Sequence, residues 1–234
     1  MSRVLDRFRR RFNRLVHHAL WWISRLMQAL DRSYHQDAVK VQTLLRDNSE
    51  EAFNRVYSDP DLLEHYLVGE RLSFYREVAR RIDHHFHSDK ALASCLDAGC
   101  GTGHLLVEMR KVGFSGRLVG LDSASAAGQH VRSHGFEFCH GDLSDQHWRS
   151  EFDIVLCTEV LEHCAYPAAL VRLLLEVVKP GGMIAITVPD GRKDTWEGHI
   201  HFWSPESFKL FIDSFEKSSA FEYFDNTNFC IMRC

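Results

Sequence analysis

Two carboxylates and two imidazoles lie where they can act together. Glu159, Glu162 and His163 follow a short apolar run, and residues three and four apart share one face of a helical turn. His199 follows the next run of this kind, so it can arrive from a neighbouring loop. Such oxygen and nitrogen ligands can hold a divalent ion, Mg²⁺ or Mn²⁺, beside a substrate hydroxyl. The pattern therefore predicts a metal site made of these four side chains.

Two other interpretations of these residues stay open. In the first, His163 or His199 removes the substrate proton as a general base, because the pKa of imidazole lies near neutral. His163, His199 and Glu162 are then the candidate catalytic residues. In the second, Glu162 and His163 position the loop or a cofactor through hydrogen bonds to the backbone.

A glycine-rich turn precedes these residues in the chain. Residues 96–103 read Leu-Asp-Ala-Gly-Cys-Gly-Thr-Gly, between an apolar run at 91–95 and a helical pattern at 104–110. Glycines allow a sharp bend and a close approach to a ligand. The helix start behind the turn offers unpaired N–H groups. The order of strand, turn and helix predicts a site for an anionic or electron-rich cofactor group.

Two acids follow at the ends of the next expected strands. Asp122 lies about 20 residues beyond the turn, where a carboxylate can accept both hydroxyls of a ribose. Asp142 can accept from an adenine amino group, with Leu143 against the ring, or it can cap a helix.

The elements that must position these residues alternate along the chain. Strands are expected at 117–122, 136–140, 153–157 and 183–188, with helices at 123–134 and 166–178 between them. This alternation predicts an α/β fold with a parallel sheet covered on both faces, and ligands at the carboxyl ends of its strands. A helix starting at Ser204-Pro205 and a hairpin around Asn226-Thr227 are expected to close the fold.

Helical patterns also precede the glycine turn. Residues 1–46 place apolar side chains on one stripe, and residues 1–30 carry seven arginines against one acid, Asp6. This suits an interfacial helix on anionic lipid, an Arg-rich targeting segment, or a helix packed on the core or on a second copy of the chain. Residues 47–90 form a second helical segment that breaks at 59–61.

Composition limits the class of protein. The chain has 234 residues, of which 45% are hydrophobic and 26% charged, with a net charge of −4. This is typical of a globular domain and gives no general reason to expect a nucleic-acid partner. The seven cysteines form no Cys-x-x-Cys pair, so a zinc knuckle is not expected. Their odd number, and the position of most of them in apolar runs, indicate a reducing, cytoplasmic setting. The apolar run at 19–23 is too short to span a bilayer.

Five motifs occur in a characteristic order: 96–103, Asp122, 141–142, 152–155 and 175–182. In order and spacing they resemble the class I S-adenosylmethionine (SAM) dependent methyltransferases. The strings at 158–163 and 198–206 are similar to those of the small-molecule type found in ubiquinone and menaquinone biosynthesis. This resemblance favours His199 over His201 as the inward histidine.

The resemblance implies a Rossmann-like, seven-stranded mixed sheet with helices on both faces and an N-terminal helical extension. It divides the chain into a basic amphipathic extension (1–48), a helical lid (49–90) and a SAM-binding domain (91–234). Tyr57, Tyr66 and Arg71 are candidate contacts from the lid. The implied cofactor-binding residues are Asp97, Gly99, Cys100, Gly101, Gly103, Asp122, Ser123, Asp142, Leu143, Thr158 and Glu159.

The expected activity is O-methylation of a small-molecule hydroxyl on a sugar, a quinone-like compound or a natural product. Three alternatives remain. The small-RNA 2′-O-methyltransferases use a similar Glu-x-x-Glu-His and a later histidine to hold magnesium. A nicotinamide oxidoreductase would need a third glycine at 104, where His104 stands. A non-catalytic SAM-binding scaffold would work through its N-terminal helices. Peripheral membrane contact through residues 1–30 and a homodimer are further expectations.

Overall fold

The computed structural model describes residue 23, residue 41 and residues 43–234. This part of the chain forms one sheet of seven strands. They are β1 (Cys95–Ala98), β2 (Leu118–Asp122), β3 (Glu137–His140), β4 (Phe152–Thr158), β5 (Val178–Pro189), β6 (Ser218–Phe224) and β7 (Thr227–Arg233). Their order is β3-β2-β1-β4-β5-β7-β6, with β7 antiparallel to both neighbours and the other pairs parallel. This mixed sheet confirms the predicted fold class.

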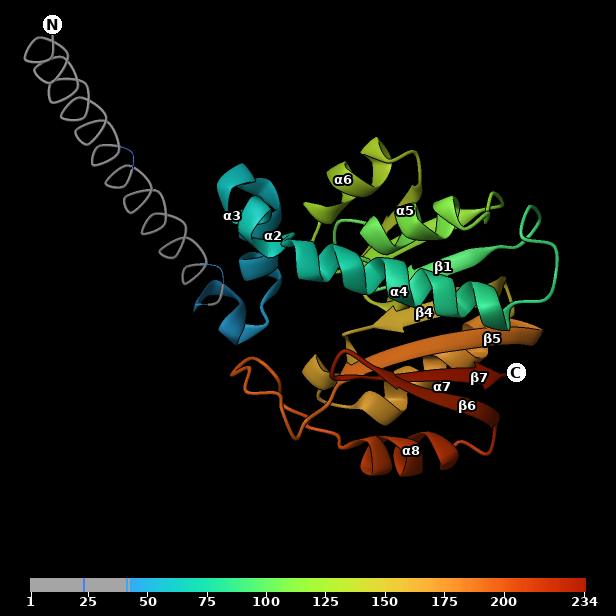
Figure 1. Cartoon of the computed structure of the whole chain (residues 1–234). Helices are drawn as coiled ribbons and strands as arrows, with labels where there is room; N and C mark the ends of the chain where they lie inside the picture. The colour runs from blue at the N-terminus through green and yellow to red at the C-terminus, as the bar shows by residue number, and fades with distance from the viewer. Residues whose placement is uncertain (1–22, 24–40, 42) are drawn as a thin grey trace, which may run out of the picture.

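Helices cover both faces of the sheet (Figure 1). They are α2 (Glu50–Ser58), α3 (Pro60–Tyr66), α4 (Gly69–His85), α5 (His104–Lys111), α6 (Ala127–Ser133), α7 (Pro167–Val177) and α8 (Pro205–Asp213), with single 3-10 turns η1 (Leu45–Asp47), η2 (Leu143–Asp145) and η3 (Leu161–His163). One face carries α4, α5 and α6, and the other carries α7 and α8.

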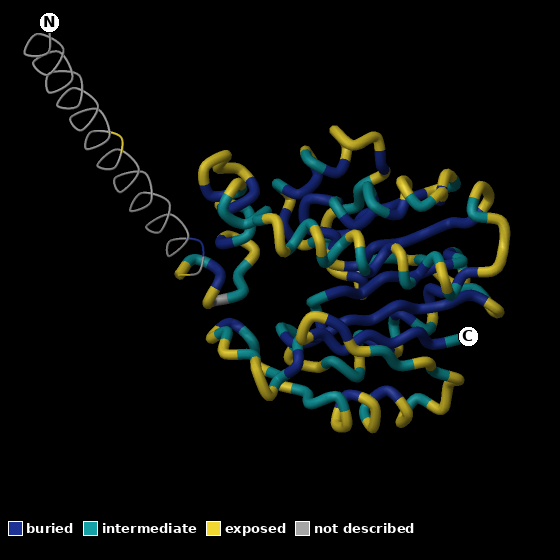
Figure 2. Tube along the Cα trace, in the orientation of Figure 1, coloured by how far each residue is buried: buried dark blue, intermediate teal, exposed yellow. Residues whose placement is uncertain are grey.

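The central strands are buried on both faces because nearly all of their side chains are apolar. In β1, Cys95 packs toward α4 and α5, whereas Leu96 and Ala98 pack toward α7. Figure 2 shows these strands as a continuous buried band through the centre of the molecule. Since parallel strands end at the same edge, the carboxyl ends of β1, β2 and β4 lie together.

The segment before the sheet forms its own small apolar cluster. Side chains of η1, α2 and α3 pack against Ala124 and Ala127 at the start of α6. The predicted break at 59–61 is confirmed, because the Asp59 carboxylate accepts from the backbone N–H groups of Asp61 and Leu62 and so caps α3. The amphipathic pattern predicted for 1–46 falls almost wholly outside the described residues.

Several predicted boundaries are wrong by a few residues. Strand β1 begins at Cys95 rather than at 91, so Asp97 lies in the strand and not in the turn. Helix α6 begins at Ala127, four residues late, because the chain first turns around the Asp122 side chain. The helix expected at 166–178 ends at Val177, because β5 already begins at Val178. The hairpin turn is Asp225-Asn226, both with the positive φ that a tight two-residue turn requires.

Within 23, 41 and 43–234, no helix is both long and apolar enough to cross a bilayer. All seven cysteines lie among the described residues, and their thiols are free. The division at 48 and 90 stays a prediction. Helix α4 nevertheless shares the main core through Val78, Ala79 and Ile82, so half of the predicted lid is tied to the sheet.

Candidate functional site

A cavity of about 680 Å³ opens at the carboxyl ends of β1, β2 and β4. The strand ends and the loops after them line one side, and α2, α3 and α4 contribute the other. It brings most of the predicted cofactor and catalytic residues into one space. The predicted residues that line it are Asp97, Gly99, Cys100, Gly101, Asp122, Ser123, Asp142, Thr158, Glu159, Glu162, His163 and His199.

Side chains at two positions of the glycine turn would press against neighbouring residues. Gly99 has φ +84°, and a Cβ there would lie 2.4 Å from Cγ2 of Val160. Gly101 has φ +49°, and a Cβ there would meet the Tyr57 hydroxyl at 3.1 Å. The turn is therefore closely packed beneath the cavity, with bare backbone facing the ligand space.

Asp122 holds this turn in place through its carboxylate. One oxygen accepts from the Gly101 N–H at 2.7 Å, and the other accepts from the Ala124 N–H at 2.8 Å. Burial raises the pKa of Asp122, and the two backbone hydrogen bonds oppose that shift. Because each carboxylate oxygen has a second lone pair, the group can still accept from a ligand in the cavity.

Asp97 is a buried acid with an unused acceptor. Its side chain is only 1% exposed, and its Oδ1 has no hydrogen-bond partner among the described residues. Burial, with the nearby charge of Asp122 as a second cause, raises the pKa of Asp97 to about 8. A buried carboxyl of this kind costs free energy unless a donor or a cation meets it. It therefore indicates where a positively charged ligand group can bind.

Other predicted cofactor residues take different positions. Asp142 is exposed at the rim of the cavity, and its N–H donates to Asp145. Leu143 lies outside the lining and is buried in the core that packs under α7. Gly103 also lies outside the lining, and a Cβ there would approach Val131 of α6 at 3.0 Å. Leu143 and Gly103 therefore pack behind the cavity lining and do not face the cavity.

Glu159 does not join the predicted metal ligands. It has φ +55°, and its Oε1 accepts from the Thr187 hydroxyl at 2.9 Å. Burial raises its pKa to about 7. The strained backbone turns this side chain toward β5, so the four predicted ligands reduce to three.

The other three side chains converge. Glu162, His163 and His199 each place a ligand atom within 4.8 Å of the others. Glu162 is fully buried, and both carboxylate oxygens are without a hydrogen-bond partner in the described part of the chain. Its backbone carbonyl accepts from the N–H groups of Ile200 and His201, which ties the later loop to η3. These two hydrogen bonds explain why His199 lies beside Glu162 and His163, which precede it by 37 and 36 residues.

The two imidazoles are oriented by hydrogen bonds at Nδ1. His163 Nδ1 lies 3.3 Å from the Gly198 carbonyl, and His199 Nδ1 lies 2.5 Å from Oδ2 of Asp194. Donation from both Nδ1 positions leaves each Nε2 able to act as a ligand or a base. Nε2 of His199 is 4.0 Å from Oε1 of Glu162.

Burial controls the charges in this cluster. It raises the pKa of Glu162 well above its usual value, with the charge of Glu159 as the next cause. Burial and the neighbouring His199 lower the pKa of His163 to about 4. An arriving cation would therefore displace the proton that burial favours on Glu162, whereas His163 is already neutral near neutral pH.

Asp194 is a site residue that sequence reasoning missed. It follows β5 on an irregular loop, and no periodic pattern places it five residues before His199 with its carboxylate turned back. His201, the other candidate for the inward position, lies outside the cavity lining: its Nε2 bonds to the Cys164 carbonyl at 2.9 Å, and its ring stacks on Trp203.

Aromatic side chains and one arginine line the opposite side. Tyr57, Tyr66 and Arg71 line the cavity as proposed for the lid segment, and Tyr75 joins them. The Arg71 guanidinium lies over the Tyr66 ring at 4.3 Å and donates to the Tyr66 hydroxyl at 3.3 Å. No carboxylate of the described residues lies within ion-pair distance of Arg71. The cavity thus holds a positive group available to an anion.

Comparisons with known proteins find relatives over part of this chain. Curated relatives include the mitochondrial ubiquinone biosynthesis O-methyltransferase of Schizosaccharomyces pombe, 31% identical over 134 residues, which are 53% of this chain and 46% of the relative. The ubiquinone biosynthesis O-methyltransferase of Albidiferax ferrireducens is 37% identical over 98 residues, 38% of each chain. The matched stretches span less than half the length of these relatives.

Solved structures show the same fold at low identity. A SAM-dependent methyltransferase from Thermotoga maritima, described as a possible histamine N-methyltransferase, superimposes with a TM-score of 0.59 at 12% identity and covers 76% of this chain and 97% of its own. A putative O-methyltransferase from Nostoc punctiforme gives 0.60 at 11%, covering 78% and 60%. The family described as a methyltransferase domain matches residues 69–231. That match takes in α4, β1 to β6, most of β7 and the strand ends that line the cavity, and this chain therefore belongs to the methyltransferase-domain family.

Proposed function

We propose that this protein is a SAM-dependent O-methyltransferase acting on a small-molecule hydroxyl. The observation that carries the proposal is the continuity of the cavity. One space joins the glycine turn, and the buried acid Asp97 at the end of β1, to the polar cluster of Glu162, His163 and His199. A methyl donor held at the turn and a hydroxyl held at the cluster would meet inside the same cavity.

The chain offers a partner for each charged or polar part of SAM. Asp97 would accept from the ammonium group, and Arg71 would pair with the carboxylate of the methionine part. Asp122 would accept from the ribose, and Asp142 from the adenine. The DhpI–SAM–HEP complex, a structural neighbour with a TM-score of 0.50, is a case in which SAM is bound on this fold.

The chemistry asks two things of the protein. The acceptor oxygen must approach the methyl carbon in line with the bond from that carbon to sulfur, which breaks as the new C–O bond forms. The hydroxyl proton must leave as this happens. His199 is suited to take it, because Asp194 fixes its Nδ1 and leaves Nε2 facing the cavity.

A divalent ion is the second way to activate the hydroxyl. Glu162, His163 and His199 would hold it, and the two unpartnered oxygens of Glu162 are the observation that fits such an ion. One carboxylate with two imidazoles is a mixed donor set, which suits Mn²⁺ better than Mg²⁺. Such an ion would lower the pKa of a bound hydroxyl.

The test uses the full chain. Calorimetry with S-adenosylhomocysteine measures the cofactor site alone, and release of this product from SAM measures turnover with a panel of phenols, catechols and sugars. Turnover is then repeated in EDTA and after Mn²⁺ is restored. Turnover that is lost in EDTA and recovered with Mn²⁺ supports the ion. Full turnover in EDTA leaves His199 as the base. Failure to bind S-adenosylhomocysteine contradicts the whole proposal.

The alternatives have weaker support. Curated relatives named O-methyltransferases do not favour a nicotinamide oxidoreductase, an RNA-end methyltransferase or a non-catalytic scaffold. Peripheral membrane contact through residues 1–30, a homodimer and a cytoplasmic setting stay proposals from the sequence. Flotation with anionic liposomes, comparing the full chain with a variant that lacks residues 1–30, tests the first.

A further inference from the structure

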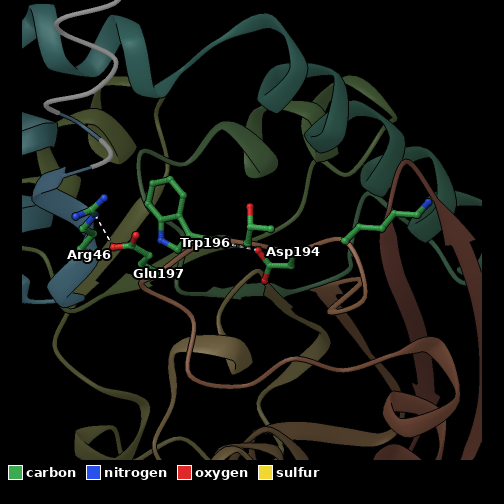
Figure 3. Close-up of a pocket in the computed structure, with 6 residues that line it drawn as sticks. Arg46, Asp194, Trp196 and Glu197 are labelled. Atoms are coloured by element: carbon green, nitrogen blue, oxygen red, sulfur yellow. Dashed lines mark hydrogen bonds and ion pairs between the residues drawn. The ribbon is translucent and has the colours of Figure 1, made fainter.

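A second hollow of about 430 Å³ adjoins the main cavity. Its lining residues are Arg46, Lys193, Asp194, Thr195, Trp196 and Glu197, shown in Figure 3. Asp194 and Trp196 also line the main cavity, so one short stretch of chain forms a shared wall. If the hydroxyl of an acceptor reaches His199, the rest of the molecule would lie near Asp194 and Trp196, which border both spaces.

The charged groups around the hollow balance in number, and each has an ion-pair or hydrogen-bond partner. Arg46 forms an ion pair with Glu197 at 3.0 Å (Figure 3). Lys193 donates to Oδ1 of Asn226 at 2.7 Å. Asp194 is engaged by His199 through one oxygen and by the Trp196 N–H through the other. Two cations and two anions, all with partners, give no net charge that would select an ionic ligand.

Trp196 supplies the flat apolar surface in this lining. The side chain is partly exposed, and the five other lining residues end in charged or hydroxyl groups. A long hydrocarbon tail would gain little here, because it would bury polar groups without giving them hydrogen bonds. A sugar ring offers a C–H face to the indole and hydroxyls that both donate and accept around it.

We infer that the methyl acceptor is a neutral polyhydroxylated molecule, a sugar or glycoside, whose ring beyond the reacting hydroxyl lies against Trp196 in the second hollow. This inference rests on the proposed function and narrows it to a substrate class. It sets this chain apart from an enzyme for a substrate with a long apolar tail.

The experiment compares two probe sets on the protein saturated with S-adenosylhomocysteine, so that no turnover is needed. The first set is p-nitrophenyl glycosides of rhamnose, mannose and glucose, and the second is catechol and a 3-prenylcatechol. Saturation-transfer NMR reports which ligand protons touch the protein. With SAM in place of its product, kcat and KM are then measured for each ligand.

Two variants locate the contact. Trp196→Ala is expected to raise KM for the best glycoside by about tenfold, the effect of losing one ring contact. Thr195→Trp fills the hollow from an exposed position. It should also raise KM for the best glycoside, without disturbing the core. Leu92→Ala, an exposed position before β1, is the matched control and should change neither constant.

The outcomes separate the two proposals. Glycoside ring protons that show saturation transfer, lost in Thr195→Trp, support the sugar site. Binding of no glycoside, or glycoside binding that neither variant alters, overturns it, as does a higher kcat/KM for the prenylated catechol. The proposed function fails separately, if S-adenosylhomocysteine does not bind in calorimetry.

Discussion

Oδ2 of Asp194 lies 2.5 Å from Nδ1 of His199, and this bond turns Nε2 of the imidazole toward Glu162. The carboxylate thereby fixes both the tautomer and the ring plane of the histidine. Asp194 and His199 lie on the loop after β5, whereas Glu162 lies on the loop after β4. The reacting cluster is thus assembled across two strand ends.

Asp194→Ala should lower kcat by roughly 10- to 100-fold, because an unsupported His199 can rotate and exchange tautomers. The affinity for S-adenosylhomocysteine should stay unchanged, since the Asp194 carboxylate bonds to His199 and to the Trp196 N–H rather than to the glycine turn. Steady-state kinetics and calorimetry measure the two effects. Asp213→Ala, which removes an exposed carboxylate on α8, is the control. A loss of cofactor affinity equal to the loss of kcat would contradict this role.

Asp122→Ala should weaken the binding of S-adenosylhomocysteine by about 100-fold, because charge-assisted hydrogen bonds to the ligand and to the turn are lost together. Asp122→Asn keeps one acceptor oxygen for the Gly101 N–H. Its affinity for S-adenosylhomocysteine should therefore lie between those of Asp122→Ala and the wild type. Calorimetry is the measurement, with Glu176→Ala on α7 as the surface control. Equal affinities of Asp122→Ala and wild type would remove Asp122 from the site.

Much of this arrangement is predictable from local patterns. The glycine spacing at 96–103 and the apolar runs predict the sheet and its ligand-binding edge, because backbone bends and strand burial depend on nearby residues. The convergence of Glu162, His163 and His199 is also predictable, since they follow neighbouring strands.

Other features depend on contacts that no local pattern contains. Glu159 turns away to Thr187 because its φ is positive, and a sequence gives no sign of that at a non-glycine residue. Asp194 reaches His199 through an irregular loop. The second hollow exists only because Arg46, from before α2, meets a loop some 150 residues later. Such long-range contacts are set by how the elements pack, which no local sequence pattern encodes.

Gly99→Ala tests the packing of the turn. A Cβ at Gly99 would lie 2.4 Å from Val160, and the positive φ adds strain, so the free energy of unfolding should fall by about 2–4 kcal/mol. Gly181→Ala is a matched control, because its φ of +80° is similar but no atom lies within 4 Å of the added Cβ. It should cost only about 1–2 kcal/mol. Urea denaturation measures both, and equal losses would show that the contact with Val160 relaxes freely.

Asp97→Asn tests the buried acid through the pH dependence of stability. Because burial raises the pKa of Asp97 to about 8, the folded protein keeps a proton that the unfolded chain releases near pH 4. The stability contribution of Asp97 is therefore intact below pH 4 and falls as pH rises toward 8, with a slope of at most about 1.4 kcal/mol per pH unit.

Without ligand, Asp97→Asn should remove that slope and be more stable than the wild type at pH 8, because an amide needs no proton to stay neutral. Thermal unfolding between pH 5 and pH 9 measures the difference between the two proteins, which cancels the contributions of Glu159 and Glu162. With SAM present the order should reverse, since its ammonium group would pair with the ionised carboxylate and not with the amide. A variant whose melting curves follow those of the wild type at every pH would show that Asp97 is ionised already in the empty protein.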